Sequence, residues 1–222
     1  MKPEVIFENR RDAGKKLAEH LTQYKNRLVV ILAIPNGGVP IGLEVAREMN
    51  DAEFDVVISR KIPMPLSPEA GFGAIADDGT MILNEEIVKK LNLTMEQIDY
   101  EANKVRETIK KRTLMYRGNR PLTRVIGKTV IVIDDGLASG ITMKAAVESI
   151  RHRHPKEIIV AVPTASTTAL SLVRPVADGI ITCVIGEPPY AVADYYRHWY
   201  DVSDAEVVRI LDTWRTQYMV SR

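Results

Sequence analysis

The sequence predicts an α/β protein with a doubly wound, mostly parallel five-stranded sheet and flanking helices. Short apolar runs rich in Val and Ile alternate with segments whose hydrophobic residues recur at helical spacing, as in successive βαβ units. These runs are continuous and do not alternate with polar residues, which is typical of strands buried on both faces of a parallel sheet. Ligands of such sheets bind outside the carboxyl ends of the strands, so we expect functional residues directly after the strands.

The N-terminal part of the chain predicts a helix, a strand and a second helix. Hydrophobic residues at helical spacing, with charges on the opposite face, predict an amphipathic helix over residues 9–24. A β-branched run predicts a strand at residues 28–34, which ends in a Pro-Asn-Gly-Gly turn at residues 35–38. Helical spacing returns at residues 39–49, which completes the order strand, tight turn, helix.

The run at residues 54–59 predicts a second strand, which the basic pair Arg60-Lys61 ends. Residues 62–80 contain three Pro and three Gly. We therefore expect a long loop here, and a loop of this length inside a compact domain is usually functional or mobile.

A helical insertion is expected at about residues 84–124. Residues 84–91 predict a short helix, and a longer helix begins at Thr94 and extends to about Leu114. Gln97 stands three residues after Thr94, where it can complete a capping box.

The C-terminal half returns to the alternation of strands and helices. The predicted elements are strands at 128–134, 157–162 and 179–185, and helices at 141–151, 166–173 and, capped by Ser203, 203–219. An aromatic-rich segment at about residues 186–202 separates the last strand from the last helix. We expect one domain over residues 1–222.

Composition excludes several classes of protein. The 222 residues, 45% of them hydrophobic, suffice for a sizeable core, and 30 Lys and Arg against 29 Asp and Glu give no global charge that would attract nucleic acid. A lone Cys183 cannot form an internal disulfide, and the first thirty residues are charged where a signal peptide needs an apolar stretch. Because the apolar runs are also too short to span a bilayer, we expect a cytoplasmic protein without a membrane partner.

Two adjacent carboxylates, Asp134 and Asp135, stand at the end of the third predicted strand, and a small, hydroxyl-rich loop follows them. Small residues let backbone N–H groups approach an anion, and Ser139 and Thr142 add hydroxyl donors at the start of a helix. The loop contains neither G-x-G-x-x-G nor a P-loop. A phosphate cradle beside carboxylates that suit hydroxyl donors predicts a ribose 5-phosphate site.

Residues 130–142, Val-Ile-Val-Ile-Asp-Asp-Gly-Leu-Ala-Ser-Gly-Ile-Thr, match throughout the motif by which type I phosphoribosyltransferases bind 5-phosphoribosyl-1-pyrophosphate (PRPP), so the chain resembles this family. The resemblance implies that Asp134 and Asp135 hold the ribose hydroxyls and that residues 138–142 bind the 5-phosphate. It also implies Mg²⁺, held mainly by PRPP with help from the two Asp residues. The PRPP-binding residues expected on this basis are Asn36, Gly37, Gly38, Asp134, Asp135, Gly136, Leu137, Ala138, Ser139, Gly140, Ile141 and Thr142.

The turn at residues 35–38 falls where the family places its pyrophosphate loop, and its two glycines would let backbone amides face the anion. Several relatives carry a basic residue where this chain has Asn36. We therefore expect Mg²⁺ and Arg60 or Lys61 to neutralise the pyrophosphate.

Arg60 and Lys61 stand where the flexible catalytic loop of the family begins. A cation that a closing loop delivers would stabilise the charge that develops on the departing pyrophosphate. The resemblance thus implies four catalytic residues, which are Arg60, Lys61, Asp134 and Asp135.

The acceptor side has fewer signals. Residues 186–200 resemble the hood of purine-type phosphoribosyltransferases, in which an aromatic residue stacks on the base, and Tyr190 is the candidate. Ala138 stands where hypoxanthine-guanine enzymes carry an Asp, so their proton-transfer scheme does not apply here. Residues 162–165 contain no Lys that would recognise a purine oxygen. The resemblance implies a nitrogen acceptor, expected to be a nucleobase, without identifying it.

The segment at residues 104–128 holds nine Lys or Arg against one Glu. We interpret it as a solvated helix face, with contacts to pyrophosphate, a neighbouring subunit or RNA as alternatives.

The chain is most similar to a group of uncharacterised candidate phosphoribosyltransferases. The expected function is phosphoribosyl transfer from Mg-PRPP with release of pyrophosphate, by a homodimer that binds no nucleic acid. One alternative is a PRPP-sensing regulator with reduced catalysis that binds nucleic acid through the basic helix. Another is an enzyme that cleaves PRPP without a base acceptor.

Overall fold

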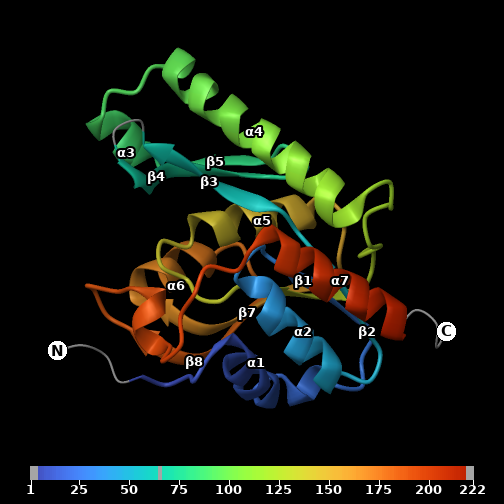
Figure 1. Ribbon diagram of the computed structural model, residues 1–222. Helices are drawn as coiled ribbons and strands as arrows, with labels where there is room; N and C mark the ends of the chain where they lie inside the picture. Colours follow the sequence, from blue (N-terminus) through green and yellow to red (C-terminus); the bar gives the residue numbers. More distant parts are fainter. Residues whose placement is uncertain (1–4, 65–66, 219–222) are drawn as a thin grey trace.

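The centre of the protein is a five-stranded sheet in which every neighbouring pair of strands is parallel (Figure 1). The structure is a computed structural model, and it describes residues 5–64 and 67–218. The strand order β2-β1-β6-β7-β8 confirms the predicted doubly wound fold. The strands are β1 (Val29–Ala33), β2 (Ala52–Val56), β6 (Thr129–Ile133), β7 (Glu157–Ser166) and β8 (Gly179–Gly186).

Helices cover both faces of this sheet because its strands are apolar on both sides. Val29, Ile31 and Ala33 of β1 belong to one hydrophobic core, whereas Val30 and Leu32 belong to another. The first core lies under α1 (Arg10–Glu19), α2 (Gly38–Glu48) and α7 (Asp204–Tyr218), and the second under α5 (Ile141–Arg151) and α6 (Thr167–Val173).

A second, antiparallel sheet packs against α5 where the long loop was predicted. Its strands, in the order β3-β4-β5, are β3 (Ser59–Met64), β4 (Ser67–Ala76) and β5 (Met81–Leu83). The prediction of an irregular loop over residues 62–80 is therefore wrong, although residues 65 and 66 lie outside the described residues. The three Pro and three Gly in this stretch are typical of loops, and they therefore led to the wrong prediction. Pro63 is tolerated because β3 is an edge strand, and its pairing with β4 is irregular at that residue.

The predicted insertion forms α3 (Glu85–Lys90) and α4 (Met95–Arg117), and α4 lies across the antiparallel sheet (Figure 1). The predicted capping box is present. Thr94 Oγ1 accepts the backbone N–H of Gln97 (3.2 Å), and Gln97 Oε1 accepts that of Thr94 (2.9 Å). The helix continues three residues beyond the predicted end at Leu114, and its C-terminal part contacts α7.

Arg117, the last residue of α4, fixes this end of the helix to both sheets. Its side chain is 5% exposed and donates to the carbonyl oxygen of Val56 (2.9 Å). Its two terminal nitrogens lie 3.7 Å from carboxylate oxygens of Asp55 and Asp77. The orientation of α4 is therefore set by buried ionic contacts as well as by apolar packing.

Several element boundaries differ from the predictions. The first helix ends at Glu19, and a 3-10 turn, η1 (Thr22–Tyr24), follows. The second strand ends at Val56, so Ser59 belongs to β3, and β7 extends to Ser166, so residues 163–165 are a strand. Ser203 accepts the backbone N–H of Glu206 (3.2 Å), as expected of a cap, and residue 219 of the predicted last helix lies outside the described residues.

Candidate active site

The carboxyl ends of the central strands meet at one edge of the sheet. Ala33 pairs with both Val56 and Ile133, so the chain leaves β1, β2 and β6 at the same level. The turn after β1 and the Asp pair after β6 therefore lie side by side, as their place after the strands predicts. Leu137 continues this edge through an isolated bridge with Ala165 of β7.

Asp134 and Asp135 are held in a defined arrangement at this edge. Asp134 Oδ1 accepts the backbone N–H of Asp135 (2.8 Å), and the Tyr196 hydroxyl donates to the carbonyl oxygen of Asp135 (2.7 Å). Burial and the neighbouring Asp135 carboxylate raise the pKa of Asp134 well above the usual range. The Asp134 carboxylate is thus poorly solvated, and hydroxyl donors from a ligand would stabilise its ionised form.

Arg10, the first residue of α1, forms an ion pair with Asp135. Its Nε and Nη2 both donate to Asp135 Oδ2, at 3.0 and 2.8 Å, and Nη1 donates to the carbonyl oxygen of Tyr200 (2.7 Å). The guanidinium carbon also lies 3.9 Å from the centroid of the Trp199 ring. Burial raises the pKa of Asp135, and Arg10 acts against that increase. Sequence reasoning missed Arg10 because no local pattern marks a residue 125 positions away from its partner.

The loop after the Asp pair has the backbone geometry of an anion cradle. Gly140 has a φ of +78°, in the left-handed region that favours glycine, and α5 begins at the next residue. Ala138 and Ser139 are exposed, so they are available to a ligand, and the start of α5 adds its positive dipole end. The side chains of Leu137 and Ile141 are buried in hydrophobic clusters. These two predicted binding residues can offer only backbone groups.

The same loop contacts the hood on one side and the antiparallel sheet on the other. Gly136 lies against Val192 of the 3-10 helix η2 (Val192–Tyr195). Thr142, in the first turn of α5, accepts a hydrogen bond from the Ser59 hydroxyl at its carbonyl oxygen (2.9 Å). Both neighbours fix the position of the loop relative to the rest of the site.

The turn at residues 35–38 packs directly against the Asp pair. A Cβ atom at Gly37 would lie 1.8 Å from Asp135 Oδ2, so only glycine fits. The Pro35–Asn36 peptide bond is cis. The Asn36 amide nitrogen donates to the Val202 carbonyl oxygen (2.8 Å) and to Asp204 Oδ1 (2.9 Å), so the start of α7 engages this side chain. Because the Asn36 side chain is occupied in this way, the turn would contact a ligand mainly through its backbone.

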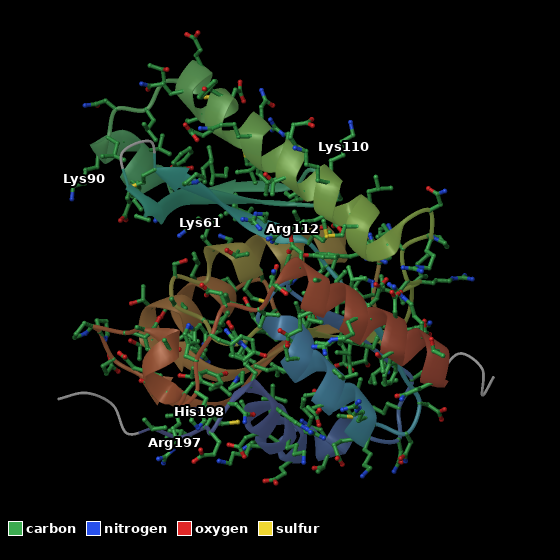
Figure 2. All side chains as sticks on the ribbon, in the orientation of Figure 1. Lys61, Lys90, Lys110, Arg112, Arg197 and His198 are labelled. Atoms are coloured by element: carbon green, nitrogen blue, oxygen red, sulfur yellow. The ribbon has the colours of Figure 1, made fainter. Side chains whose placement is uncertain are left out.

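Arg60 and Lys61 lie on β3, not at the end of β2 where they were expected. Arg60 is half-buried, and burial together with the nearby Arg112 lowers its pKa. Figure 2 shows Lys61 and Arg112 directed from the antiparallel sheet and α4 toward the layer that contains α5 and α7. A cavity of about 560 Å³ extends from Pro35 to α4, and Arg60, Lys61 and Lys104 are among its lining residues.

Tyr190 follows β8 and lies near the Asp pair. Its hydroxyl donates to Thr164 Oγ1 (3.0 Å), and its ring is tilted against Tyr195 with 5.4 Å between the centroids. Burial is the main cause of the raised pKa of Tyr190, and the charges of Asp134 and Asp135 contribute to it. The hood thus holds an aromatic ring against Thr164, which itself lies next to Gly136 of the loop after the Asp pair.

The donor set at this edge suits a metal ion that a phosphate ligand carries. Mg²⁺ prefers oxygen ligands and commonly takes one or two carboxylates together with substrate phosphates. Arg10 engages Oδ2 of Asp135, whereas Asp134 makes no ion pair with any residue that the structure describes. Over residues 5–64 and 67–218, no group of three or more His, Cys, Asp or Glu could hold a metal alone. No helix in the same ranges is both long and apolar enough to cross a membrane.

Comparison with known proteins identifies the family. The sequence model described as "phosphoribosyl transferase domain" matches residues 5–195. The chain belongs to this family. It is 34% identical over 207 residues to candidate phosphoribosyl transferases from two strains of Mycobacterium tuberculosis, CDC 1551 and H37Rv. These matches cover 93% of this chain and 46% of each relative, so the chain spans about half the length of the curated relatives it matches.

Solved structures share the architecture. The crystal structure of TT1426 from Thermus thermophilus is 33% identical, with a TM-score of 0.77 over 94% of this chain and 99% of that one. AQ2163 from Aquifex aeolicus is 12% identical, with a TM-score of 0.51 over 80% of this chain and 75% of that one. This second similarity supports a shared fold and nothing further. The resemblance drawn from residues 130–142 is thereby confirmed at the level of the family.

In this phosphoribosyl transferase domain, part of the positive charge in the basic segment at residues 104–128 is neutralised by carboxylates, which the sequence of the segment did not indicate. Four of its cations pair with carboxylates from other parts of the chain or from the preceding helical turn. The pairs are Lys104 with Glu101, Arg112 with Asp204, Arg117 with Asp55 and Asp77, and Lys128 with Glu53. The interpretation as a solvated helix face therefore needs correction at Arg112 and Arg117, because packing against α7 and β2 brings their carboxylate partners close.

Proposed function

We propose that this chain binds Mg-PRPP at the carboxyl edge of the central sheet and transfers the phosphoribosyl group to a nitrogen acceptor, a nucleobase, with release of pyrophosphate. The observation that carries the proposal is the direct contact between the Gly37 turn and Asp135, beside the loop that begins α5. Two carboxylates lie between two segments suited to phosphate, which matches the order of phosphate, ribose and pyrophosphate in PRPP. A cytoplasmic location and a homodimer belong to the same proposal.

Each part of the site has a separate role in this proposal. Asp134 and Asp135 accept hydrogen bonds from the ribose hydroxyls, and residues 138–142 bind the 5-phosphate through backbone N–H groups and hydroxyls. The turn at residues 36–38 contacts the pyrophosphate, toward which Arg60 and Lys61 contribute positive charge. Bound Mg²⁺ would help to neutralise the charge that builds on the pyrophosphate as its bond to C1 breaks. The acceptor nitrogen forms the new bond to C1, and the electron pair of the broken bond leaves with pyrophosphate.

The decisive experiment measures pyrophosphate release from Mg-PRPP with a panel of purines, pyrimidines and small amines. We expect at least one nucleobase to stimulate release and a ribonucleotide to accumulate in equal amount. PRPP binding without stimulation by any acceptor would instead indicate a regulator. Release at the same rate with and without acceptors would indicate cleavage of PRPP by water. Absence of PRPP binding would overturn the proposal.

Tyr190 is the expected stacking residue for the acceptor. Tyr190→Ala should raise the KM for the acceptor by about tenfold or more, because stacking on a base contributes about 1–3 kcal/mol. Tyr190→Phe keeps the ring and loses only the hydrogen bond to Thr164, so it should stay within about threefold of the wild type. The KM for PRPP should not change in either variant. Equal acceptor KM values for the Ala variant and the wild type would exclude stacking on Tyr190.

A further inference from the structure

We propose that Arg112, on the insertion helix α4, supplies the positive charge toward pyrophosphate that the turn after β1 lacks at Asn36. The proposal rests on the proposed function, because pyrophosphate is the leaving group of PRPP. It assigns a ligand-binding role to one residue of the basic segment and hence to the insertion itself.

Arg112 is joined to the turn through one carboxylate oxygen. Its Nη2 lies 3.0 Å from Asp204 Oδ1, which also accepts the amide N–H of Asn36 (2.9 Å) and the hydroxyl of Tyr116. The Arg112 side chain is 18% exposed, so it is largely enclosed but still reachable by a ligand. A single acidic residue thus holds α4, α7 and the turn together, with a guanidinium group next to the turn.

The charges around Asp204 do not balance. Arg60 and Arg112 are close enough for Arg112 to lower the pKa of Arg60, and both act to lower the pKa of Asp204. On the side of the turn that faces α7, two guanidinium groups against one carboxylate leave an excess of positive charge, in a partly buried position where charges are weakly screened. The Asp pair and Arg10 lie on the other side, next to Gly37. A phosphate anion would complete the neutralisation. This excess is at the place where the proposed function requires a pyrophosphate.

The position of α4 directs Arg112 toward the cavity that begins at Pro35. Lys104 and Thr108 of α4 line that cavity, and Arg112 follows Thr108 by four residues, on the same face of the helix. Figure 2 shows Arg112 between α4 and the start of α7, whereas Lys110, two residues earlier, points to the outside. Since buried Arg117 fixes this end of α4, Arg112 is held in place rather than delivered by a mobile loop.

The test compares binding of inorganic pyrophosphate and of ribose 5-phosphate, both measured calorimetrically with Mg²⁺. Arg112→Gln should weaken pyrophosphate binding by about tenfold or more, the effect of losing one charge-assisted contact to an anion. Binding of ribose 5-phosphate should stay within about twofold, because Asp134, Asp135 and the loop at 138–142 are unchanged. Lys110→Gln, an exposed residue of the same helix, is the matched control and should leave both affinities unchanged.

Asp204→Asn separates a ligand contact from a purely structural role. The amide side chain of this variant could still accept from Asn36 and Tyr116 through its oxygen, but it would no longer compete with an anion for Arg112. We therefore expect Asp204→Asn to maintain or increase the affinity for pyrophosphate. If Arg112 only positioned the turn through Asp204, the two variants would weaken binding alike. Arg112→Lys should recover part of the loss because it restores the charge.

The outcomes distinguish this inference from the proposed function. Wild-type affinity for pyrophosphate in Arg112→Gln, or parallel losses in Arg112→Gln and Asp204→Asn, would overturn the role of Arg112 while the proposed function stands. A wild-type protein that binds neither PRPP nor pyrophosphate would overturn both. Thermal unfolding of each variant checks that altered binding is measured on folded protein.

Discussion

Asp134→Asn is expected to weaken PRPP binding by on the order of 100-fold and to abolish measurable pyrophosphate release. Hydrogen bonds to charged groups contribute about 1.5–3 kcal/mol each, and the ionised Asp134 would accept such bonds from the ribose. The Asn variant keeps an oxygen that can accept the backbone N–H of Asp135, so the local backbone should be preserved. Calorimetric titration with Mg-PRPP and a coupled pyrophosphate assay measure both effects.

The stability of the same variant should change in the opposite sense. The pKa of Asp134 is raised in the folded protein, so ionisation of this carboxyl disfavours the folded state above the pKa of the unfolded chain. Asp134→Asn removes that cost. Its stability relative to the wild type should therefore increase as the pH rises from about 4 through the raised pKa, and then remain constant.

Asp99→Asn is the control for both measurements, because Asp99 is exposed on α4 away from the sheet edge. It should bind PRPP and unfold as the wild type does. Loss of stability in Asp134→Asn at neutral pH, together with unchanged PRPP affinity, would mean that this carboxyl has a structural role and would remove the basis of the proposed ribose site.

The central sheet was predictable because its signals are local. Each strand is a continuous apolar run, each helix shows its period, and Thr94 and Ser203 mark helix starts by residue type alone. The antiparallel sheet was not predictable in this way. Pro63 is compatible with β3 only because that strand is at an edge, and the sequence does not reveal which strands are edges.

The residues of the candidate site also fall into those that local sequence signals mark and those that only the tertiary fold brings to the site. Asp134, Asp135 and the loop that follows them form one contiguous motif, so their chemistry could be inferred before the fold was known. Arg10 and Arg112 reach the site from distant segments, and each is one of 30 Lys and Arg in the chain. Only tertiary packing distinguishes them from solvated residues. Asn36 illustrates the converse, because its place in the turn at residues 35–38 was evident from the sequence, but its hydrogen bond to Asp204 was not.

Arg10→Met is expected to lower the free energy of unfolding at pH 7 by about 3 kcal/mol. Removing one partner of a buried ion pair commonly costs about 3–5 kcal/mol because the other charge stays buried without compensation. We expect the lower end of this range because the Asp135 side chain is 16% exposed, while Arg10 is 4% exposed. Met preserves part of the packing of the Arg10 side chain, so most of the loss should be electrostatic. Denaturant unfolding monitored by circular dichroism measures it.

Arg11→Met is the control, because Arg11 is adjacent to Arg10 but its side chain is 68% exposed. Its partner Glu44 is buried and keeps a second ion pair with Arg47, so loss of Arg11 does not leave that carboxylate unpaired. The stability of this variant should stay within about 1 kcal/mol of the wild type.

The double variant Arg10→Met with Asp135→Asn removes both charges and should regain part of the stability that Arg10→Met alone loses. Without the Arg10 cation, the pKa of Asp135 should rise further, so the destabilisation should decrease as the pH falls through that value. A loss that is the same at acidic and neutral pH, and that Asp135→Asn does not relieve, would assign the effect to packing against Trp199 instead of to the ion pair.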